Sequence, residues 1–393
     1  MGSSRPESRG EFEVAIVCAL PLEYDAVTLL IDEFWDENGD IYGRAIGDNN
    51  TYTTGRVGNH NVVVALLPGM GKLHAAFAVA GLRSSYTNIN LALVTGICGG
   101  VPRAGTINEI LLGDVIISET IVQYDFGRQY PSGFTTKLNV QDSFGRSNAD
   151  MRGLLAVLRT EMGFQRLQQR ASFFLQTIHS KAAMMGRPSH YSYPGTHADR
   201  LFDPGYVHKH YGPSECACSR WVDLTDPVCE DAATSPYAAT GCSTDQLLPR
   251  RRLRMRQALE GQSIGTNVQE PLILLGPVAS GDNVMKSATD RDPIAEAHKV
   301  IAFEMEGPGA WDKLPSLVIK GVCDYADSHK DNCWQMFAAA TAAATVRAVL
   351  ERYIQTDRVA RMGQVGRSPQ ERSQQVLMIP LTSIGRRRLC KPL

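Results

Sequence analysis

The 393-residue sequence has almost no net charge, because 40 lysines and arginines are balanced by 41 aspartates and glutamates. A domain that binds nucleic acid through bulk electrostatics usually carries a basic excess, so that class is disfavoured. No apolar run comes near the roughly 20 residues that a bilayer requires; the longest runs include Val14–Leu22 and Leu91–Cys98. The first of these runs follows two glutamates and lacks a small-residue cleavage site, so no secretory signal is expected.

Cysteine is sparse and scattered. The nine cysteines are an odd number, and Cys18, Cys98 and Cys323 lie inside apolar runs typical of buried strands. A reduced thiol in such a run behaves as a small hydrophobic side chain, whereas structural disulfides belong to oxidising compartments. We therefore expect an intracellular protein in a reducing compartment and assign it to the cytoplasm.

Short apolar runs alternate with helical patterns along most of the chain. We predict strands at 13–20, 51–57, 61–67, 91–97, 110–126, 271–279, 300–303 and 317–322, and helices at 22–32, 73–84, 150–183, 284–298 and 334–354, with a short helix from 305. Continuous apolar strands that alternate with helices indicate a sheet covered on both faces. We expect an α/β fold of three α-β-α layers around a central mixed, mostly parallel sheet, in one large domain at 13–356.

Three segments lack these patterns. Residues 1–12 are polar and are predicted to be a flexible tail, and residues 357–393 are polar with clustered arginines and are predicted to be disordered. Residues 184–262 are rich in Pro, Ser, Tyr, His and Cys and have no sustained period. We predict that they form an irregular insertion within the domain.

Carboxylates follow the predicted strands at their carboxyl ends, where the ligands of parallel sheets collect. Of five groups of residues that follow a strand, four contain a carboxylate: Pro21–Glu23, Ser280–Asp282, Glu304–Glu306 and Asp324–Asp327, the fifth group being Gly96–Gly100. A single carboxylate after a strand commonly caps a helix, and this remains an equal alternative for Asp282 and Asp327. Three carboxylates at separate strand ends, Glu23, Glu306 and Asp324, are better explained by a shared catalytic site.

Seven short motifs occur in a fixed order: ALPLE at 19–23, GMGK at 69–72, TGICGG at 95–100, LGDV at 112–115, SGD at 280–282, FEME at 303–306 and CDYAD at 323–327. This succession resembles the purine nucleoside/uridine phosphorylase superfamily, whose members include methylthioadenosine/adenosylhomocysteine nucleosidase. ALPLE, VQYDFG at 122–127 and CDYADSHK at 323–330 are more similar still to the fungal phosphorylase-like domain that precedes NACHT or ankyrin regions. The resemblance covers about 13–135 and 268–355.

The resemblance implies cleavage of an N-ribosidic bond at a sugar that becomes oxocarbenium-like. Asp324 corresponds to the acid directed at the purine ring nitrogen, which can donate a proton only if burial or a neighbouring carboxylate raises its pKa. Glu306 corresponds to the glutamate that binds the ribose hydroxyls, with Met305 packed against the sugar, and Glu23 to the glutamate that activates water. Further substrate-binding positions are assigned to Glu304, Gly99, Cys98, Val284 and Ser280.

The choice between hydrolysis and phosphorolysis depends on cationic groups, because a phosphorylase must hold a phosphate dianion with Arg and hydroxyl donors. At the positions where the family's phosphorolytic members carry these donors, this sequence has Val94, Ile97 and the acidic Glu23. A carboxylate repels phosphate and suits the activation of water. We therefore predict hydrolysis, with phosphorolysis as the alternative, and interpret Gly99-Gly100 as a tight turn rather than a phosphate cradle. Val284 stands where many relatives place a Phe that stacks on the base, so stacking must come from another residue.

Three other patterns have simpler interpretations. GMGK at 69–72 is not a P-loop, because Leu66 and Leu73 replace the required Gly and Ser or Thr, so we predict a turn into a helix. A zinc site is suggested by His208, His210, Cys216, Cys218, Cys229 and Cys242, but their spacing fits no standard ligand pair, and no metal is expected. The arginines at 250–252, 254 and 256 form either a solvated helix face or a contact for nucleotide 5′ phosphates.

Together these observations predict an enzyme that hydrolyses a purine nucleoside to the free base and ribose without a metal or organic cofactor. The expected partner is the small-molecule nucleoside, with no nucleic acid and no membrane, and the relatives suggest a homo-oligomer. An alternative of another class is a non-catalytic module that senses a nucleoside or nucleotide in a receptor-like system. No NACHT or ankyrin pattern follows residue 357, which favours a stand-alone enzyme.

Overall fold

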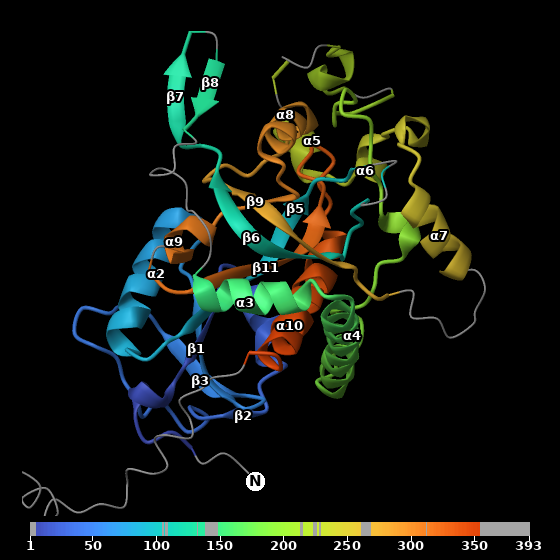
Figure 1. Ribbon diagram of the computed structural model, residues 1–393. Coiled ribbons are helices and arrows are strands. Elements are labelled where there is room, and N and C mark those ends of the chain that lie inside the picture. Colours follow the sequence, from blue (N-terminus) through green and yellow to red (C-terminus); the bar gives the residue numbers. More distant parts are fainter. Residues whose placement is uncertain are drawn as a thin grey trace, which may run out of the picture. The chain divides into compact units, whose positions relative to one another are not determined.

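The computed structural model describes residues 5–353, apart from 104–105, 107–108, 132, 138–147, 213–214, 223–225, 228, 261–268 and 312 (Figure 1). The residues up to Tyr353 form one compact unit. The tail predicted at 357–393 lies outside the described residues, as do the first four residues of the predicted N-terminal tail.

Nine strands of the described residues form one mixed sheet in the order β10-β9-β6-β11-β5-β1-β4-β3-β2. They are β1 (Val14–Cys18), β2 (Glu33–Phe34), β3 (Tyr52–Val57), β4 (His60–Leu66), β5 (Leu91–Gly100), β6 (Val115–Gln123), β9 (Ile273–Ser280), β10 (Ala302–Glu304) and β11 (Ser316–Asp324). A separate hairpin is formed by β7 (Gly127–Tyr130) and β8 (Gly133–Thr136). The prediction of an α/β fold with a central mixed sheet is confirmed.

One end of the sheet closes on itself. β11 runs parallel to β5 and antiparallel to β6. β6, β9 and β10 run parallel to one another, and β10 also pairs antiparallel with β5. These five strands therefore form a ring, closed where Ala302 and Phe303 of β10 lie opposite Gly100 and Gly99 of β5.

The expected tight turn at Gly99-Gly100 is wrong, because both residues belong to β5. A Cβ on Gly99 would lie 2.8 Å from Ala326 Cβ and 2.9 Å from Asp324 Oδ1, and one on Gly100 would lie 2.7 Å from Val322 Cγ1. Glycine is needed here because side chains of β11 and the residues after it approach the β5 backbone closely.

The helices are α1 (Pro21–Thr28), α2 (Lys72–Ser85), α3 (Ala149–Leu158), α4 (Glu161–Met184), α5 (Glu230–Thr234), α6 (Tyr237–Thr240), α7 (Arg251–Glu260), α8 (Ala288–His298), α9 (Gly307–Trp311) and α10 (Gln335–Leu350). A Cβ on Gly321 of β11 would lie 2.0 Å from the Ala338 carbonyl of α10, whereas one on Gly307 of α9 would lie 3.3 Å from Val318 Cγ2. Residues 318 and 321 point to opposite faces of the strand. α10 and α9 therefore pack on opposite faces of β11.

The segment Asn332–Leu350 has the length and hydropathy of a membrane span, but 78% of its most apolar window is buried inside the protein. It packs against β5 and β11, and against α1 and α4. Its alanines allow this close approach to the sheet. The segment is therefore a core helix of the fold.

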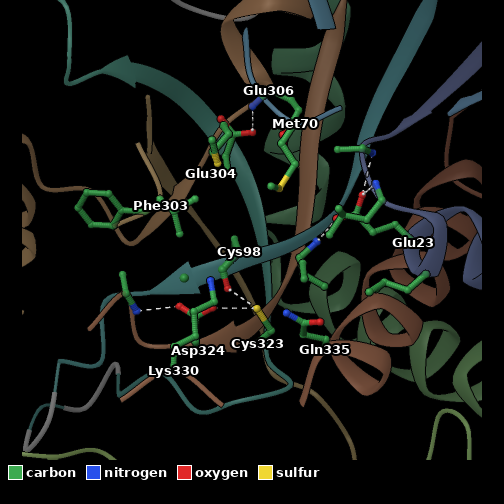
Figure 2. A pocket seen from close by; sticks show the side chains of 18 of the residues that line it. Glu23, Met70, Cys98, Phe303, Glu304, Glu306, Cys323, Asp324, Lys330 and Gln335 are labelled. Atoms are coloured by element: carbon green, nitrogen blue, oxygen red, sulfur yellow. Dashed lines mark hydrogen bonds and ion pairs between the residues drawn. The ribbon is translucent and has the colours of Figure 1, made fainter. Parts of the chain in front are cut away.

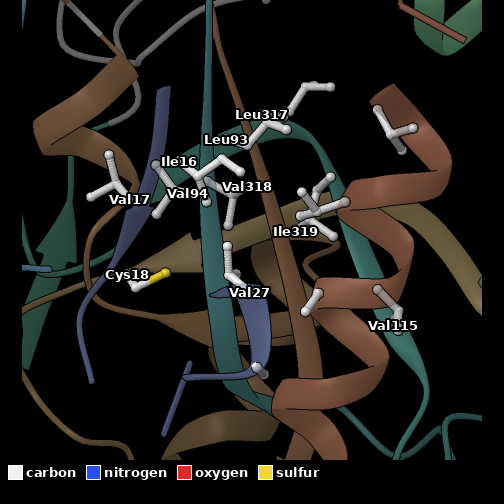
Figure 3. Close-up of a cluster of buried hydrophobic side chains, with 14 of the residues drawn as sticks. Ile16, Val17, Cys18, Val27, Leu93, Val94, Val115, Leu317, Val318 and Ile319 are labelled. Atoms are coloured by element: carbon white, nitrogen blue, oxygen red, sulfur yellow. The ribbon is translucent and has the colours of Figure 1, made fainter. Parts of the chain in front are cut away.

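The hydrophobic core is centred on the strands in the middle of the sheet. Every residue of β1 and of β11 is buried. Figure 3 shows the cluster in which side chains of β1, β5 and β11 pack together: Ile16, Val17, Leu93, Val94, Val318 and Ile319. Continuous β-branched runs of this kind suit strands covered on both faces. Lys320, in the middle of β11, is the one charged side chain within these three strands before their carboxyl ends.

The N-terminal residues that the structure describes are not a loose tail. Phe12 is fully buried, with its ring edge-on to those of Tyr42 and Tyr86 at centroid distances of 4.9 and 5.3 Å. The Tyr42 hydroxyl also donates a hydrogen bond to the Pro6 carbonyl, at 3.0 Å. The prediction of a flexible segment is therefore wrong for residues 6–12.

Arg250, before α7, and Arg252, within it, are neither on a solvated face nor free to bind phosphate, whereas Arg251 and Arg254 are exposed. The Arg250 side chain is 2% exposed and lies 3.4 Å from Glu109 and 3.5 Å from Asp199. Arg252 forms a bidentate ion pair with the fully buried Asp114. Arg252 Nη2 lies 2.8 Å from Asp114 Oδ1, and Nη1 contacts Oδ2. These pairs attach the region predicted as an insertion to the β6 end of the sheet, because Asp114 directly precedes that strand.

Candidate active site

A cavity of about 750 Å³ opens where β1, β5, β10 and β11 end (Figure 2). The loops after β1 and β11 form two of its walls, and β10 with the two residues that follow it forms another. The rest of the lining comes from Ile97–Gly99 of β5, Met70 before α2, His190, residues 283–285 before α8, and Gln335 and Met336 at the start of α10. This volume lies within the roughly 300–1,000 Å³ typical of pockets for small molecules.

Eight of the nine sequence-predicted site residues line this cavity: Glu23, Cys98, Gly99, Val284, Glu304, Met305, Glu306 and Asp324. The ninth, Ser280, is fully buried in β9 and lies outside the lining. β1, β5 and β11 run parallel, so their carboxyl ends meet as expected. β10 runs antiparallel to β5, and Glu304 and Glu306 reach the cavity because the ring closes across Gly99.

Glu23 is held rigidly at the end of β1. Pro21 begins α1, and the Glu23 carboxylate reaches back over this first turn. Its Oε2 accepts hydrogen bonds from the amides of Ala19 and Leu20 at 2.8 and 2.9 Å, and its Oε1 accepts one from Ile97 at 2.8 Å. A Cβ on Gly96, whose φ is +154°, would lie 1.9 Å from Glu23 Oε1, so the carboxylate occupies space that only glycine leaves open.

Burial raises the pKa of Glu23, the Lys320 ammonium opposes this rise, and the Glu306 carboxylate adds to it. The side chain is only 2% exposed. A carboxylate offers about four acceptor positions, and three of them are used by backbone amides. The remaining position can accept a proton from a bound water, which suits a general base.

Glu306 is paired with a lysine that the sequence analysis missed. Lys320 Nζ lies 2.8 Å from Glu306 Oε2, and both side chains are buried. The Gly71 amide donates to the other carboxylate oxygen at 3.2 Å, so the turn before α2 also positions Glu306. The available signal was a lysine in the otherwise apolar strand SLVIKGVCD, because a buried cation requires carboxylate partners.

Lys320 balances three carboxylates. Burial alone lowers the pKa of Lys320, but the carboxylates of Glu306, Glu23 and Glu304 outweigh it and raise the pKa overall. The ammonium therefore stays charged inside the protein. Its positive charge offsets the negative charges of these three carboxylates. Lys320 does so from outside the cavity, since it is not among the lining residues.

Glu304 was predicted to bind substrate, but its carboxylate is already hydrogen-bonded to backbone amides of the turn that follows it. Its carboxylate accepts hydrogen bonds from the amide of Glu306 at 2.9 Å and from that of Gly307 at 3.0 and 3.1 Å. Burial raises the pKa of Glu304, while Lys320 lowers it and Glu306 raises it. These contacts cap the start of α9 and orient Glu306.

Asp324 is surrounded by hydrogen-bond donors. Its Oδ2 lies 2.8 Å from Lys330 Nζ and accepts a hydrogen bond from the Cys323 thiol at 3.1 Å, and its Oδ1 accepts one from the Ala326 amide at 2.9 Å (Figure 2). Although burial lowers the pKa of Lys330, the Asp324 carboxylate raises it overall. An ammonium, a thiol and a backbone amide therefore surround the Asp324 carboxylate, whereas the sequence analysis expected burial or a neighbouring carboxylate to be the main influence on it.

The aromatic surface of the cavity comes from Phe303 of β10 rather than from position 284. Phe303 lies at the same end of the cavity as Asp324 (Figure 2), and its ring packs edge-on against Tyr124 at 5.5 Å. Val284 lines the cavity with 44% exposure. Phe303 was quoted in a sequence motif, but only the ring closure of β10 onto β5 reveals that it faces the cavity.

Among the described residues, the cavity lining contains one lysine, Lys330, one histidine, His190, and no arginine. Lys330 forms an ion pair with Asp324. Lys320, outside the lining, likewise forms an ion pair with Glu306. Of the three positions expected to distinguish hydrolysis from phosphorolysis, Glu23 and Ile97 line the cavity and Val94 is buried in the core. A phosphate dianion would therefore compete with a carboxylate for each nearby cation.

The two carboxylates with alternative capping roles, Asp282 and Asp327, lie outside the lining. Asp282 Oδ1 accepts a hydrogen bond from the Lys72 amide at 3.0 Å, at the start of α2. Asp327 accepts one from the His329 amide at 2.9 Å. Their contacts are those of structural residues that fix the turns around the cavity.

The GMGK motif at 69–72 forms a turn into a helix, as predicted. The helix begins at Lys72, and the turn positions Glu306 through the Gly71 amide.

The sequence was compared with known families and proteins. Residues 13–161 match the sequence model of the phosphorylase superfamily. This segment is similar to sequences of the phosphorylase superfamily. It contains Glu23, Cys98 and Gly99, whereas Glu306 and Asp324 lie beyond the matched residues of the superfamily model.

Two kinds of relative are similar to this chain. A nucleotide-binding leucine-rich repeat (NLR)-like protein of Hyaloscypha variabilis is 28% identical over 346 residues, covering 86% of this chain and 29% of that protein. A 5′-methylthioadenosine/S-adenosylhomocysteine nucleosidase of Mycobacterium bovis is 27% identical over 115 residues, covering 29% of this chain and 39% of that enzyme. This chain thus spans less than half the length of either relative.

Solved structures that align with this chain include the 5′-methylthioadenosine/S-adenosyl homocysteine nucleosidase of Helicobacter pylori. It has a TM-score of 0.48 and 13% identity, with 88% of this chain and 100% of that chain covered. The futalosine hydrolase of the same organism gives a TM-score of 0.48 and 13% identity, with 87% and 100% covered.

Proposed function

We propose that this domain hydrolyses the N-glycosidic bond of a purine nucleoside and releases the free base and ribose. The observation that carries the proposal is the meeting of Glu23, Glu306 and Asp324 at one cavity. Residues from three separate strand ends converge there, and capping does not explain all three. Lys330 and Lys320, the cations closest to these carboxylates, are each paired with one of them, so a phosphate co-substrate has no cationic seat among the described residues.

In the proposed reaction, Glu23 accepts a proton from water as the water oxygen forms a bond to the sugar C1′. The C1′–N bond breaks, and its electron pair leaves with the purine. Glu306 binds the ribose hydroxyls, and Met305 packs against the sugar. The Asp324–Lys330 pair supplies the proton at the departing base, with the proton resting on Lys330 and passing through Asp324 as negative charge develops on the purine. Phe303 provides the stacking surface.

The assay that tests the proposal supplies adenosine, guanosine, inosine and 5′-methylthioadenosine, each with and without inorganic phosphate, and separates the products by chromatography. We expect free base and ribose from at least one of these nucleosides at a rate independent of phosphate. Glu23→Gln should abolish the product and serves as the control for contaminating activity. Formation of ribose 1-phosphate at a phosphate-dependent rate would identify a phosphorylase instead.

A second candidate is a non-catalytic module that senses a nucleoside or nucleotide. It is favoured by the similarity to an NLR-like protein, which extends over 86% of this chain. The same assay separates the two candidates: a sensor binds nucleoside in calorimetry and yields no product. We place hydrolysis first because a sensor has no need for a carboxylate with a free acceptor position beside a sugar-binding glutamate.

The acidic limb of the pH profile is predicted from Glu23. Because burial raises its pKa above the ordinary glutamate value, the base is lost by protonation at a higher pH than for an exposed glutamate. We therefore expect kcat/KM to fall on the acid side of the profile with an apparent pKa above the usual 4.3 of a glutamate. A profile measured from acid to neutral pH that stays flat down to about 4.5 would contradict Glu23 as the base.

We further propose that the domain has three α-β-α layers with 184–262 as an insertion, that it lies in the cytoplasm and that it forms a homo-oligomer. The packing of α9 and α10 on opposite faces of β11 supports the layering. Leu73 and Phe77, one turn apart on α2, are 64% and 70% exposed and offer an apolar surface for a second copy.

A further inference from the structure

We propose that His210, Cys216, Cys218 and Cys229 bind a structural zinc ion, in addition to the proposed nucleosidase site. These residues come from a segment that precedes α5 and lies outside the cavity lining. One ligand atom from each lies within 4.8 Å of those of the other three. The sequence analysis considered zinc here and did not expect it, because the linear spacing fits no standard ligand pair.

The distances within this group fit tetrahedral zinc. With Zn–S bonds of about 2.3 Å and a Zn–N bond of about 2.0 Å, two sulfurs lie about 3.8 Å apart and a sulfur and a nitrogen about 3.5 Å apart. Cys216 Sγ lies 3.7 Å from Cys229 Sγ, and His210 Nδ1 lies 3.2 Å from Cys218 Sγ and 3.8 Å from Cys229 Sγ. A disulfide is excluded for the Cys216–Cys229 pair, because its S–S bond would be about 2.05 Å long.

The donor set points to zinc among the common metals. Three sulfurs and one imidazole nitrogen form one of the closed sets of structural zinc sites, and thiolates do not suit magnesium or calcium. Cys218 is fully buried, whereas the other three residues are half-buried, which leaves an entry path for the ion. The His210 amide also donates to Cys218 Sγ at 3.4 Å, a contact that orients a ligating sulfur.

The segment needs such a support because it has little apolar core. Among its described residues between 207 and 242, the buried ones are His208, Cys218, Ala232 and Thr240. Its two helices, α5 and α6, have five and four residues. Segments that bury so little apolar surface are usually stabilised by disulfides or metals.

The same segment packs against the loop that follows β11. The His208 amide donates to Ser328 Oγ at 3.3 Å, and the rings of His208 and His329 lie edge-on with their centroids 5.1 Å apart. The next residue, Lys330, is the ion-pair partner of Asp324. A zinc ion that holds His210, Cys216, Cys218 and Cys229 together would therefore stabilise the loop that carries Lys330.

A second group, His208, Cys242 and His329, provides a matched control. Its three ligand atoms also lie within 4.8 Å of one another, but a closed structural site needs a fourth. Nε2 of His208 lies 2.8 and 3.0 Å from the carbonyls of Ala232 and Ser235, contacts that need no metal. We assign no ion to this group.

The test uses the full chain without an affinity tag, purified from zinc-supplemented cells without chelators. Mass spectrometry of the metal content should give about one zinc per chain, and Cys218→Ser and Cys216→Ser should each lose most of it. Cys242→Ser, in the second group, and Cys333→Ser, at an exposed cysteine, should keep it. Co²⁺ added to wild type freed of zinc should give the sulfur-to-metal charge-transfer bands and the intense d–d bands of a tetrahedral thiolate site.

The cobalt spectrum decides the matter if the serine variants fail to fold, because it needs only the wild-type chain. The proposal is overturned if wild-type protein contains no stoichiometric zinc and Co²⁺ gives no charge-transfer bands. It is also overturned if Cys242→Ser loses the metal while Cys218→Ser retains it. Since metal content and spectrum are independent of turnover, either result stands even if the proposed nucleosidase activity is absent.

Discussion

Replacing Asp324 with Asn is expected to lower kcat by about 10²–10⁴-fold, the usual scale for loss of a general acid. Asn can still accept the Ala326 hydrogen bond, but its amide cannot pass a proton to the purine. The two hydrogens of that amide also face Lys330 and Cys323, which donate to the carboxylate in the wild-type protein. Single-turnover measurement of base release gives kcat for the chemical step, and a melting curve checks that the variant is folded.

Replacing Lys330 with Met distinguishes the contribution of Lys330 to catalysis from that of Asp324. Asp324 then keeps its carboxyl group but loses the ammonium, 2.8 Å away, on which the transferable proton rests in the proposed reaction. We expect kcat to fall by roughly 10-fold or more near neutral pH. KM should change little, because Lys330 is proposed to deliver a proton rather than to bind the nucleoside, so a fall in kcat alone distinguishes a proton relay from a merely structural ion pair.

A matched control is Asp32→Asn, which removes the partner of Arg347 on a part of the chain outside the cavity lining. Its turnover should equal that of the wild type. Near-normal turnover of a folded Asp324→Asn variant would exclude Asp324 as the acid. A kcat for Lys330→Met equal to that of the wild type would exclude Lys330 as its proton source.

Much of the fold could be predicted because local patterns determine it. Pro21 begins α1, Gly71 precedes α2, and the apolar runs of β1, β5 and β11 are strands. Gly99-Gly100 was misinterpreted because its role depends on β10, some 200 residues away. A glycine pair at the end of an apolar run looks the same in the sequence whether it makes a turn or receives another strand.

The carboxylates of the candidate site were predictable, whereas their electrostatic partners were not. Glu23, Glu306 and Asp324 follow strands, and that position alone singles them out. Lys320 and Lys330 become meaningful only when distant residues are placed beside them. The solvated position predicted for Arg252 was wrong for the same reason. Its partner, Asp114, lies 138 positions away in the chain.

The zinc ligands illustrate the difference between linear and spatial order. The sequence places His208 and His210 two residues apart, yet the fold assigns them to different groups. Cys242 likewise joins His208 and His329 rather than the other three cysteines of its segment. Spacing rules assume that neighbouring ligands share one ion, and that assumption fails here.

Replacing Lys320 with Met is expected to lower the free energy of unfolding by about 3–5 kcal/mol at neutral pH, the usual cost of breaking a buried ion pair from one side. Methionine keeps an unbranched apolar stem, so the change removes mainly the ammonium. Glu306 loses its partner at 2.8 Å, and Glu23 and Glu304 lose the cation that lowers their pKa values. Chemical denaturation at equilibrium measures the difference.

The sign of the pH dependence follows from the same carboxylates. Without Lys320, the pKa values of Glu23 and Glu304 rise further in the folded state, while those in the unfolded chain stay ordinary. The folded variant then binds more protons than the unfolded one, so its stability falls as the pH rises through this range. The deficit relative to wild type is therefore expected to be smaller at about pH 5 than at about pH 7.

The double variant Lys320→Met/Glu306→Gln tests whether the loss comes from charge. It removes both members of the pair, and Gln can still accept the Gly71 hydrogen bond, so we expect it to be more stable than Lys320→Met alone. Its activity should stay low, because Glu306 is proposed to bind the ribose. Arg170→Met, which breaks the partly exposed pair with Glu351, should cost about 1 kcal/mol or less. If Lys320→Met lowered the free energy of unfolding no more than Arg170→Met does, the buried lysine would not be what stabilises the three carboxylates at the cavity.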